Sequence, residues 1–215
     1  REAELEEKNE RLEQFASTVS HDLRNPLSIA AGNLNLYREG GDESRLETIE
    51  TALTRSQELI TDLTTLARHG IPEENYESVA VHEVASDAWK LIDTRSAALS
   101  TEPCTVVGDT SQLTILFENL FRNAVGHGGP DVTIRVGPLA EGFYVEDTGD
   151  GIPPDEREIV FDHGYTTGYS GSGIGLTIVS RIAQSHDWDI TLTESTEGGA
   201  RFEFRTTHSA EPPDR

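Results

Sequence analysis

Four short segments of the chain hold side chains or glycines that could transfer a proton or bind a metal ion, a base or phosphate. The first covers residues 20–27, with the sequence SHDLRNPL. An imidazole exchanges protons near neutral pH, and the carboxylate of Asp22 beside His21 could orient the ring or accept its proton. Pro26 cannot donate a hydrogen bond to the carbonyl of Asp22, so a helix through this segment is expected to bend just after His21. Alone, a histidine followed by an acid is more often a solvated helix face.

The second segment covers residues 118–127, with the sequence ENLFRNAVGH, and reads as part of a helix. Asn119 and Asn123 are four residues apart and share one helix face, while Leu116 and Leu120 are placed to pack inward. Two neutral amide oxygens on one face suit a Mg²⁺ ion that keeps most of its waters and takes its other ligands from phosphates. Without further motifs, two solvated asparagines would be the favoured interpretation.

The third segment covers residues 145–153, with the sequence VEDTGDGIP, and directly follows an apolar strand. A carboxylate at the end of a strand, here Asp147, can accept a hydrogen bond from an exocyclic amine. Gly149 and Gly151 would let the backbone come close to a flat ring. Turns of this composition are common, so the segment is a weak signal by itself.

The fourth segment covers residues 166–176, with the sequence TTGYSGSGIGL, and leads into an apolar helix. Gly171, Gly173 and Gly175 remove the obstruction of a Cβ atom, and free N–H groups at a helix N-terminus attract phosphate oxygens. A flexible linker is the alternative interpretation. Linkers, however, seldom run straight into an apolar helix.

In their order along the chain, these segments resemble the H, N, G1 and G2 boxes of sensor histidine kinases, and Phe161 is placed as the F box. The resemblance covers nearly the whole chain. In the H box it implies that His21 is the phosphoacceptor and that Asp22 assists it. It also implies that Asn25 helps a water molecule to hydrolyse the phosphorylated response regulator.

The resemblance further implies a site for ATP and Mg²⁺, in which Asn123 holds the metal, Asn119 lies beside the phosphates and Asp147 recognises the adenine amino group. Gly126 stands where many members carry a basic residue, which leaves Arg122 and His127 to touch phosphate. No Walker lysine loop and no protein-kinase catalytic loop is present in the sequence. The implied nucleotide-binding residues are Asn119, Asn123, His127, Asp147, Gly149, Gly151, Gly171, Gly173, Gly175 and Leu176.

The fold class that the resemblance implies is α+β. An antiparallel helical hairpin forms a dimeric four-helix bundle and is followed by an α/β sandwich ATP-binding domain of the Bergerat type. We expect a coiled-coil signalling helix at 1–16, a dimerisation and histidine phosphotransfer domain at 17–70 and a linker at 71–77. The ATP-binding catalytic domain is expected at 78–207 and a disordered tail at 208–215.

Hydrophobic periodicity predicts the elements that position these segments. One helix is expected over residues 1–38, with a coiled-coil seam that includes Leu23. A second is expected from an Asp42 cap to about His69. Its apolar face contains Leu46, Ile49, Leu53, Ile60, Leu63 and Ala67. Strands are expected at 78–81, 105–107, 132–136, 143–146, 189–193 and 201–205, and helices at about 82–93, 110–127 and 174–186. The helices should cover one face of a mixed sheet whose last two strands form a hairpin across residues 197–199.

The function that follows is that of an ATP-dependent protein-histidine kinase. It would autophosphorylate His21 from ATP and pass the phosphoryl group to an Asp of a response regulator. Two other functions stay open. A non-catalytic ATP-binding dimerisation module would act as a scaffold or switch, and a phosphatase-dominant enzyme would mainly dephosphorylate its regulator. The sequence leaves open whether autophosphorylation runs within one protomer or across the homodimer.

The composition is strongly acidic, with 17 Lys+Arg against 39 Asp+Glu and a formal net charge of −22. Only Lys8 and Lys90 are lysines, a balance typical of a halophilic source, which we expect to be an archaeon; an acidic mesophilic protein is the alternative. Such a surface repels phosphate backbones and disfavours nucleic acid as a partner. Cys104 stands alone, and no apolar run approaches the length of a membrane span. We therefore expect a cytoplasmic fragment whose upstream sensor domain is missing.

Overall fold

The structure is a computed structural model, and it describes residues 20, 23–68, 76–94, 96–129, 131–161 and 174–206. The chain divides into two compact units, Arg1–Ala67 and Arg68–Arg215. No helix in the described ranges is long and apolar enough to cross a membrane. The expected signalling helix 1–16 and the tail 208–215 lie outside the described residues, as do most of the linker and the place of the bend expected just after His21.

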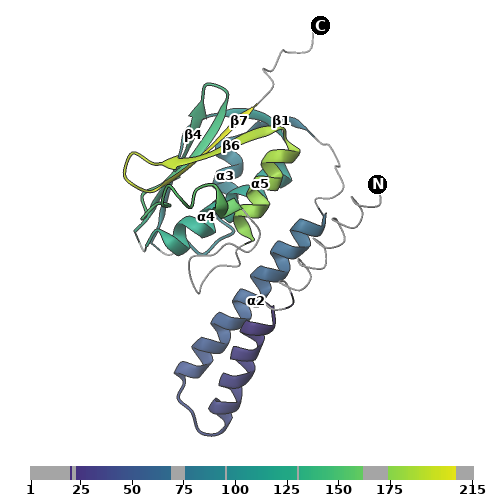
Figure 1. The fold of residues 1–215 in the computed structure, drawn as a ribbon, viewed down its shortest axis with the longest axis vertical. Helices are drawn as coiled ribbons and strands as arrows, with labels where there is room; N and C mark the ends of the chain where they lie inside the picture. Colours follow the sequence, from purple (N-terminus) through teal and green to yellow (C-terminus); the bar gives the residue numbers. More distant parts are fainter. Residues whose placement is uncertain are drawn as a thin grey trace. The chain divides into compact units, whose positions relative to one another are not determined.

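The first unit is a helical hairpin (Figure 1). Its first helix covers residues 23–38, and its second, α2, covers Ser44–Arg68. The first helix ends in a Schellman motif, because Gly41 N–H donates to the Leu36 carbonyl and Gly40 N–H to the Tyr37 carbonyl. Gly40 has a φ of 101°, which favours glycine. Asp42 Oδ1 accepts the Ser44 N–H at 3.1 Å, as expected of a capping side chain.

The apolar stripe expected on α2 is largely exposed in the single chain. Leu46, Leu53 and Ile60 are 40%, 45% and 53% exposed, whereas Ala52 and Leu59 are buried. This exposure agrees with a hairpin whose apolar stripe is covered only when a second hairpin packs on it. The apolar residues of α2 extend beyond one face, and periodicity does not say which neighbour covers which face.

Over its described residues, the second unit combines a two-stranded and a five-stranded sheet with three α-helices and one short 3-10 helix. Its strands are β1 Glu77–Ala80, β2 Ala98–Thr101, β3 Thr105–Gly108, β4 Thr133–Leu139, β5 Gly142–Asp147, β6 Trp188–Glu194 and β7 Ala200–Thr206. Its helices are α3 Val81–Trp89, α4 Thr110–His127, α5 Gly175–Ser185 and the short 3-10 helix η1 Ile159–Phe161.

The larger sheet is mixed, as expected, with strand order β2-β4-β5-β7-β6. Strands β2 and β4 are parallel, and every other neighbouring pair is antiparallel. Helices α4 and α5 pack on each other and lie on one side of the sheet (Figure 1). Phe117 of α4 contacts Phe143 of β5, which stacks on Phe204 of β7, so the core lies between the sheet and the helices.

Two local expectations about this unit differ from the structure. Strand β2 was not predicted, because its sequence ALST has one large apolar residue and no clear alternation. Pairing with β4 makes it a strand. Helix α3 begins at Val81, which had been expected to end the first strand, and it ends at Trp89 rather than at about residue 93.

Candidate active site

Helix α4 positions the two asparagines. Asp109 caps its first turn, since its Oδ1 accepts the backbone N–H groups of Ser111 at 2.9 Å and Gln112 at 3.0 Å. Burial acts to raise the pKa of Asp109, but the hydrogen bonds from Ser111 and Gln112 hold it below its ordinary value. Leu116 and Leu120 are buried as expected. Because residues three and four apart share a helix face, Asn119 and Asn123 lie beside these leucines on α4.

The two asparagines differ in how they are engaged. Asn119 is 6% exposed, and its Nδ2 donates to the Ile115 carbonyl at 2.8 Å. Asn123 is half-buried, and within the described part of the chain no hydrogen bond engages its side chain. The Asn123 amide is therefore available to a ligand, whereas the Asn119 amide is held by its own helix.

The start of α5 meets this face of α4. A Cβ atom added to Gly175 would lie 3.0 Å from Asn119 Oδ1 and 3.7 Å from Asn123 Oδ1. A side chain here would therefore crowd Asn119 and stand in ordinary contact with Asn123, so glycine allows the α5 backbone its close approach to these amides. The contact joins the second and fourth segments of the sequence analysis. Leu176 follows half-buried, and Thr177 Oγ1 donates to the Phe161 carbonyl at 3.3 Å.

Asp147 lies at the end of β5, next to the loop that holds Gly149. Its Oδ1 accepts two backbone N–H groups, from Gly149 at 2.8 Å and from Ala200 at 3.2 Å. Among the described residues no donor reaches Oδ2. Burial raises the pKa of Asp147 above its ordinary value, although these two hydrogen bonds oppose the shift. One carboxylate oxygen is thus anchored, and the other is left to accept from a ligand.

Glycines let three segments meet around Asp147. A Cβ atom on Gly149 would lie 2.5 Å from the Cα of Gly128, just after α4. Gly151 has a φ of 70°, and a Cβ there would lie 2.6 Å from the Gly198 carbonyl oxygen. The loop after β5 therefore fits between the end of α4 and the turn that joins β6 to β7.

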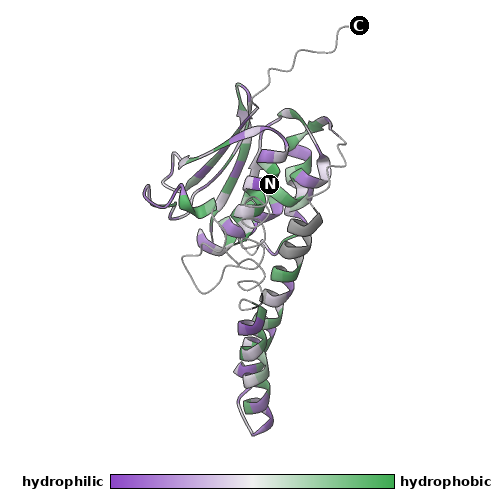
Figure 2. Cartoon of the chain, turned by 45° about the vertical axis from the view of Figure 1, so that its right-hand side comes forward, coloured by the Kyte–Doolittle hydropathy of each residue, from purple (hydrophilic) through white to green (hydrophobic). Residues whose placement is uncertain are grey.

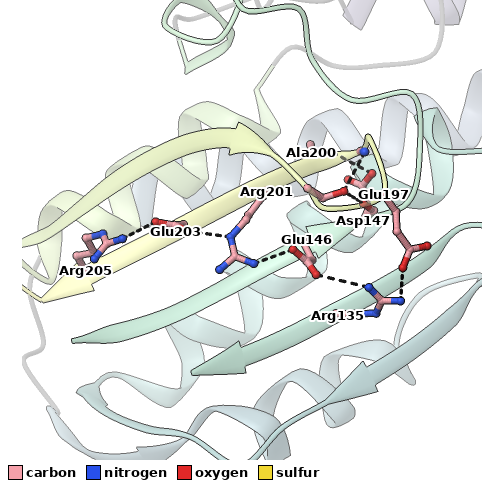
Figure 3. Close-up of polar contacts among 10 residues, drawn as sticks. Arg135, Glu146, Asp147, Glu197, Ala200, Arg201, Glu203 and Arg205 are labelled. Carbon is pink, nitrogen blue, oxygen red and sulfur yellow. Dashed lines mark hydrogen bonds and ion pairs between the residues drawn. The ribbon is translucent and has the colours of Figure 1, made fainter. Parts of the chain in front are cut away.

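A network of charged residues that no sequence motif had indicated covers the face of the five-stranded sheet that lies away from the helices (Figure 3). Glu146 is buried, and its carboxylate pairs with Arg201 at 2.7 Å and with Arg135 at 3.7 Å. Arg135 also pairs with Glu197, and Arg201 pairs with Glu203 at 2.8 Å. The alternation of charged and apolar residues along β7 was the available signal. The network compensates the buried charge next to Asp147.

A buried histidine links the helices that carry the second and fourth segments. Nε2 of His186 accepts the Asp109 backbone N–H at 3.0 Å, and Nδ1 lies 2.8 Å from the Ile182 carbonyl oxygen. These partners require the neutral tautomer with the proton on Nδ1. His186 is a core residue that joins the end of α5 to the start of α4.

The remaining predicted residues do not all meet at this site. His127 is exposed on the last turn of α4, and Arg122 is already paired with Glu118 at 2.7 Å. Asn25 is exposed on the first helix of the hairpin. His21, Asp22, Gly171 and Gly173 lie outside the described residues.

Burial raises the pKa of the Cys104 thiol to about 11, so this cysteine stays protonated at neutral pH.

Comparison with known proteins matches both units. The model of the His Kinase A (phospho-acceptor) domain matches residues 11–70. The model of the histidine kinase-, DNA gyrase B- and HSP90-like ATPases matches residues 108–210. Together the two models span most of the chain.

Individual relatives agree with this result. The chain is 32% identical to the sensor-type histidine kinase PrrB of Mycobacterium leprae, over 89% of this chain and 47% of that protein. It is 35% identical to the methanogenesis regulatory histidine kinase FilI of Methanothrix harundinacea, over 91% of this chain and 24% of that protein. The chain thus spans half or less of the length of these relatives.

A solved structure shows the same fold. The Acinetobacter baumannii histidine kinase AdeS aligns over 87% of this chain and 98% of its own, with a TM-score of 0.64 and 20% identity. The α+β fold of a phosphoacceptor hairpin followed by an ATPase domain is therefore confirmed. By its two domains and its relatives, the chain belongs to the sensor histidine kinases.

Proposed function

We propose that the chain binds ATP in its second unit, transfers the γ-phosphoryl group to His21 in its first, and passes that group to an Asp of a response regulator. The observation that carries the proposal is the meeting of Gly175 with Asn119 and Asn123. It brings the helix start that is expected to bind phosphate against the amides that are expected to lie beside it. A binding site of this kind has no role in a purely structural domain.

The base end of the nucleotide is assigned to Asp147. Its free Oδ2 accepts from the amino group of adenine, while Gly149 and Gly151 hold the loop after β5 against Gly128 and Gly198. A base that presents a carbonyl oxygen at that position is repelled by the carboxylate. Gly171, Gly173, Gly175 and Leu176 would hold the phosphates, with His127 at their edge.

Mg²⁺ fits the donors present at the other end of the site. Asn123 offers an unengaged neutral amide oxygen beside the start of α5, which suits an ion that keeps its waters and shares phosphate oxygens. The ion, when bound, supplies charge neutralisation on the transferring phosphoryl group. Asn119 then has a positioning role, since its amide is already bonded within α4.

The acceptor lies in the other unit, so we propose that the segment 71–77 acts as a linker on which the catalytic domain 78–207 reaches the phosphotransfer domain 17–70. Asp22 polarises the His21 imidazole for attack on the γ-phosphorus. Positioning and charge neutralisation supply most of the catalysis, as is usual for phosphoryl transfer.

A homodimer is the state that we propose for the first unit. The hairpin exposes several large apolar side chains in the single chain, and Figure 2 shows hydrophobic residues along its described length. These residues are Leu27, Ile29, Leu34, Leu36, Leu46, Leu53 and Ile60. A second hairpin would cover them in a four-helix bundle.

We also propose that the protein comes from a halophile, expected to be an archaeon. The support is the formal charge of −22 with only two lysines, Lys8 and Lys90. The expectation concerns the surface and is independent of the kinase assignment.

The test of the proposed function is the variant His21→Gln. Incubation with γ-labelled ATP should give no acid-labile label, while ATP affinity stays nearly unchanged because acceptor and nucleotide site lie in different units. His69→Gln is the matched control and should keep its label. Full labelling of the His21 variant would contradict the assignment. An unlabelled wild-type chain that binds ATP would instead indicate the non-catalytic dimerisation module.

A phosphatase-dominant enzyme is the second candidate function, and the exposed amide of Asn25 favours it. Asn25 lies one helical turn after His21 in the sequence and could position a water molecule for hydrolysis. Asn25→Ala should keep autophosphorylation within a modest factor but slow dephosphorylation of the partner regulator. The measurement compares both rates, and equal loss of the two would indicate a structural role near Pro26.

A further inference from the structure

The strongest unassigned feature of the second unit is a buried serine just after β6. Ser195 is 7% exposed, and its Oγ donates to the Asp147 carbonyl oxygen at 2.7 Å. The same Oγ accepts the Gly199 N–H at 2.9 Å. One hydroxyl therefore bridges the backbone of the β6–β7 turn and the backbone of Asp147, 48 residues away in sequence.

The turn holds Asp147 by its side chain as well. The N–H of Ala200, at the end of the turn, donates to Asp147 Oδ1. A Cβ atom on Gly199 would lie 2.1 Å from the Asp147 carbonyl oxygen and 2.4 Å from Oδ1, so the turn packs directly on this residue. The position of the β6–β7 turn therefore sets the positions of both the main chain and the carboxylate of Asp147.

Ser195 also closes the turn on itself. Its N–H donates to the Gly199 carbonyl at 2.7 Å, and its carbonyl accepts the Gly198 N–H at 3.1 Å. Glu197 in the turn also pairs with Arg135 of β4, but this ion pair is exposed and contributes little to stability. The buried hydroxyl is therefore the stronger link between the turn and β5.

We infer that Ser195 is a positioning residue for nucleotide recognition, acting through Asp147. The inference rests on the proposed function, in which Asp147 Oδ2 accepts from the amino group of the base. Without the hydroxyl, the Asp147 carbonyl and the Gly199 N–H lose a buried partner, and the turn shifts relative to β5. The carboxylate, held by the same turn through Ala200, then loses its alignment with the base.

The experiment separates alignment of the carboxylate from loss of stability. Dissociation constants are measured for ATP and for purine riboside triphosphate, which lacks the exocyclic amino group, on the full chain in molar KCl. The ratio of the two constants reports only the amino contact. Ser195→Ala should lower this preference for ATP by about threefold to tenfold, the equivalent of one hydrogen bond.

The matched control is Ser86→Ala in α3. Ser86 also donates to a backbone carbonyl, that of His82 at 2.7 Å, but it does not contact Asp147. Its loss should leave the preference for ATP unchanged. If Ser195→Ala weakens both nucleotides by the same factor, or neither, Ser195 has only a structural role and the inference is overturned.

Asp147→Asn distinguishes failure of the inference from failure of the proposed function. If Asp147→Asn removes the preference for ATP and Ser195→Ala does not change it, only the inference about Ser195 is wrong. If Asp147→Asn leaves the preference for ATP unchanged, the contact between Asp147 and the amino group is misassigned. Both the proposed adenine site and the inference about Ser195 are then wrong. A reduced preference for ATP in both Asp147→Asn and Ser195→Ala, with Ser86→Ala unchanged, supports both the proposed adenine contact and the inference about Ser195.

Discussion

At the scale of single residues, the site is built around a carboxylate that is costly to bury. Asp147 accepts two backbone N–H groups on one oxygen, yet burial still raises its pKa above the ordinary value of 3.8. The nearby charge of Glu146 adds to the shift. The folded state therefore disfavours the ionised form of Asp147 that binding of the base requires. The ionised carboxylate thus lowers the stability of the fold but serves nucleotide binding.

We expect Asp147→Asn to weaken ATP binding and to stabilise the fold. The lost acceptor costs about 1–3 kcal/mol, or roughly fivefold to 150-fold in affinity. Asn is nearly isosteric, and its Oδ1 can still accept from Gly149 and Ala200. Calorimetry measures the affinity, and thermal unfolding without nucleotide measures the stability. Unchanged affinity would show that the adenine end of the site is misassigned.

The stability gain of Asp147→Asn should depend on pH. The pKa of Asp147 is raised in the folded state, so below the unfolded value of 3.8 both states are protonated and the carboxyl group costs nothing. The cost develops as pH rises through the window above 3.8 and is complete at neutral pH. The difference in melting temperature should therefore be largest near neutral pH and should shrink toward acid.

At the scale of elements, the site depends on how closely α4 and α5 approach. His186 joins the end of α5 to the Asp109 N–H at the start of α4. Gly175 brings the start of α5 against Asn119 and Asn123. Because contacts at both ends fix α5 relative to α4, the phosphate-binding start of α5 keeps a constant position beside the amides of α4.

We expect Gly175→Ala to separate helix stability from nucleotide binding. Ala is the better helix former by about 1 kcal/mol, but its Cβ would lie 3.0 Å from Asn119 Oδ1, which is tighter than ordinary contacts. The buried amide must shift, and ATP affinity should fall by about tenfold, or 1.4 kcal/mol, with little change in melting temperature.

Gly126→Ala is the matched control for this experiment. It lies on α4, and nothing in the structure stands within 4 Å of the added Cβ. It should raise the melting temperature slightly without changing ATP affinity. Equal affinities for the wild type and the Gly175 variant would show that the contact between α4 and α5 does not shape the nucleotide site.

At the scale of the whole molecule, charge dominates the expected behaviour. Each chain carries a formal charge of −22, and a homodimer carries twice that value. At low ionic strength the carboxylates repel one another within a chain and across the proposed bundle. The apolar residues exposed on the hairpin act in the opposite sense, because dimerisation would bury them.

We expect stability and dimerisation to rise with KCl. From about 0.1 M to about 1 M salt the Debye length falls from roughly 10 Å to roughly 3 Å, which screens most of the repulsion. Screening also weakens the Mg²⁺ and phosphate contacts, but folding should dominate and give an activity optimum at molar salt. Thermal melts and sedimentation across this range provide the test. A chain that is folded and dimeric in dilute buffer, with no gain on adding KCl, would contradict the halophilic interpretation alone.

Several parts of this protein were determined by local sequence. Helix α4 was predicted with its observed limits, because Asp109 caps it and its apolar residues keep helical spacing. The hairpin of β6 and β7 followed from a glycine turn between two alternating strands, and Gly198 has the expected positive φ of 94°. The four motif segments carried the family assignment, because each keeps its residues within a short stretch of chain.

Tertiary structure alone decided the features that join distant segments. Strand β2 exists through its pairing with β4. The approach of Gly175 to Asn119 and the bridge from Ser195 to Asp147 likewise depend on contacts across about 50 residues. Periodicity and turn chemistry act over a few residues, whereas these contacts exist only once the sheet and helices have packed.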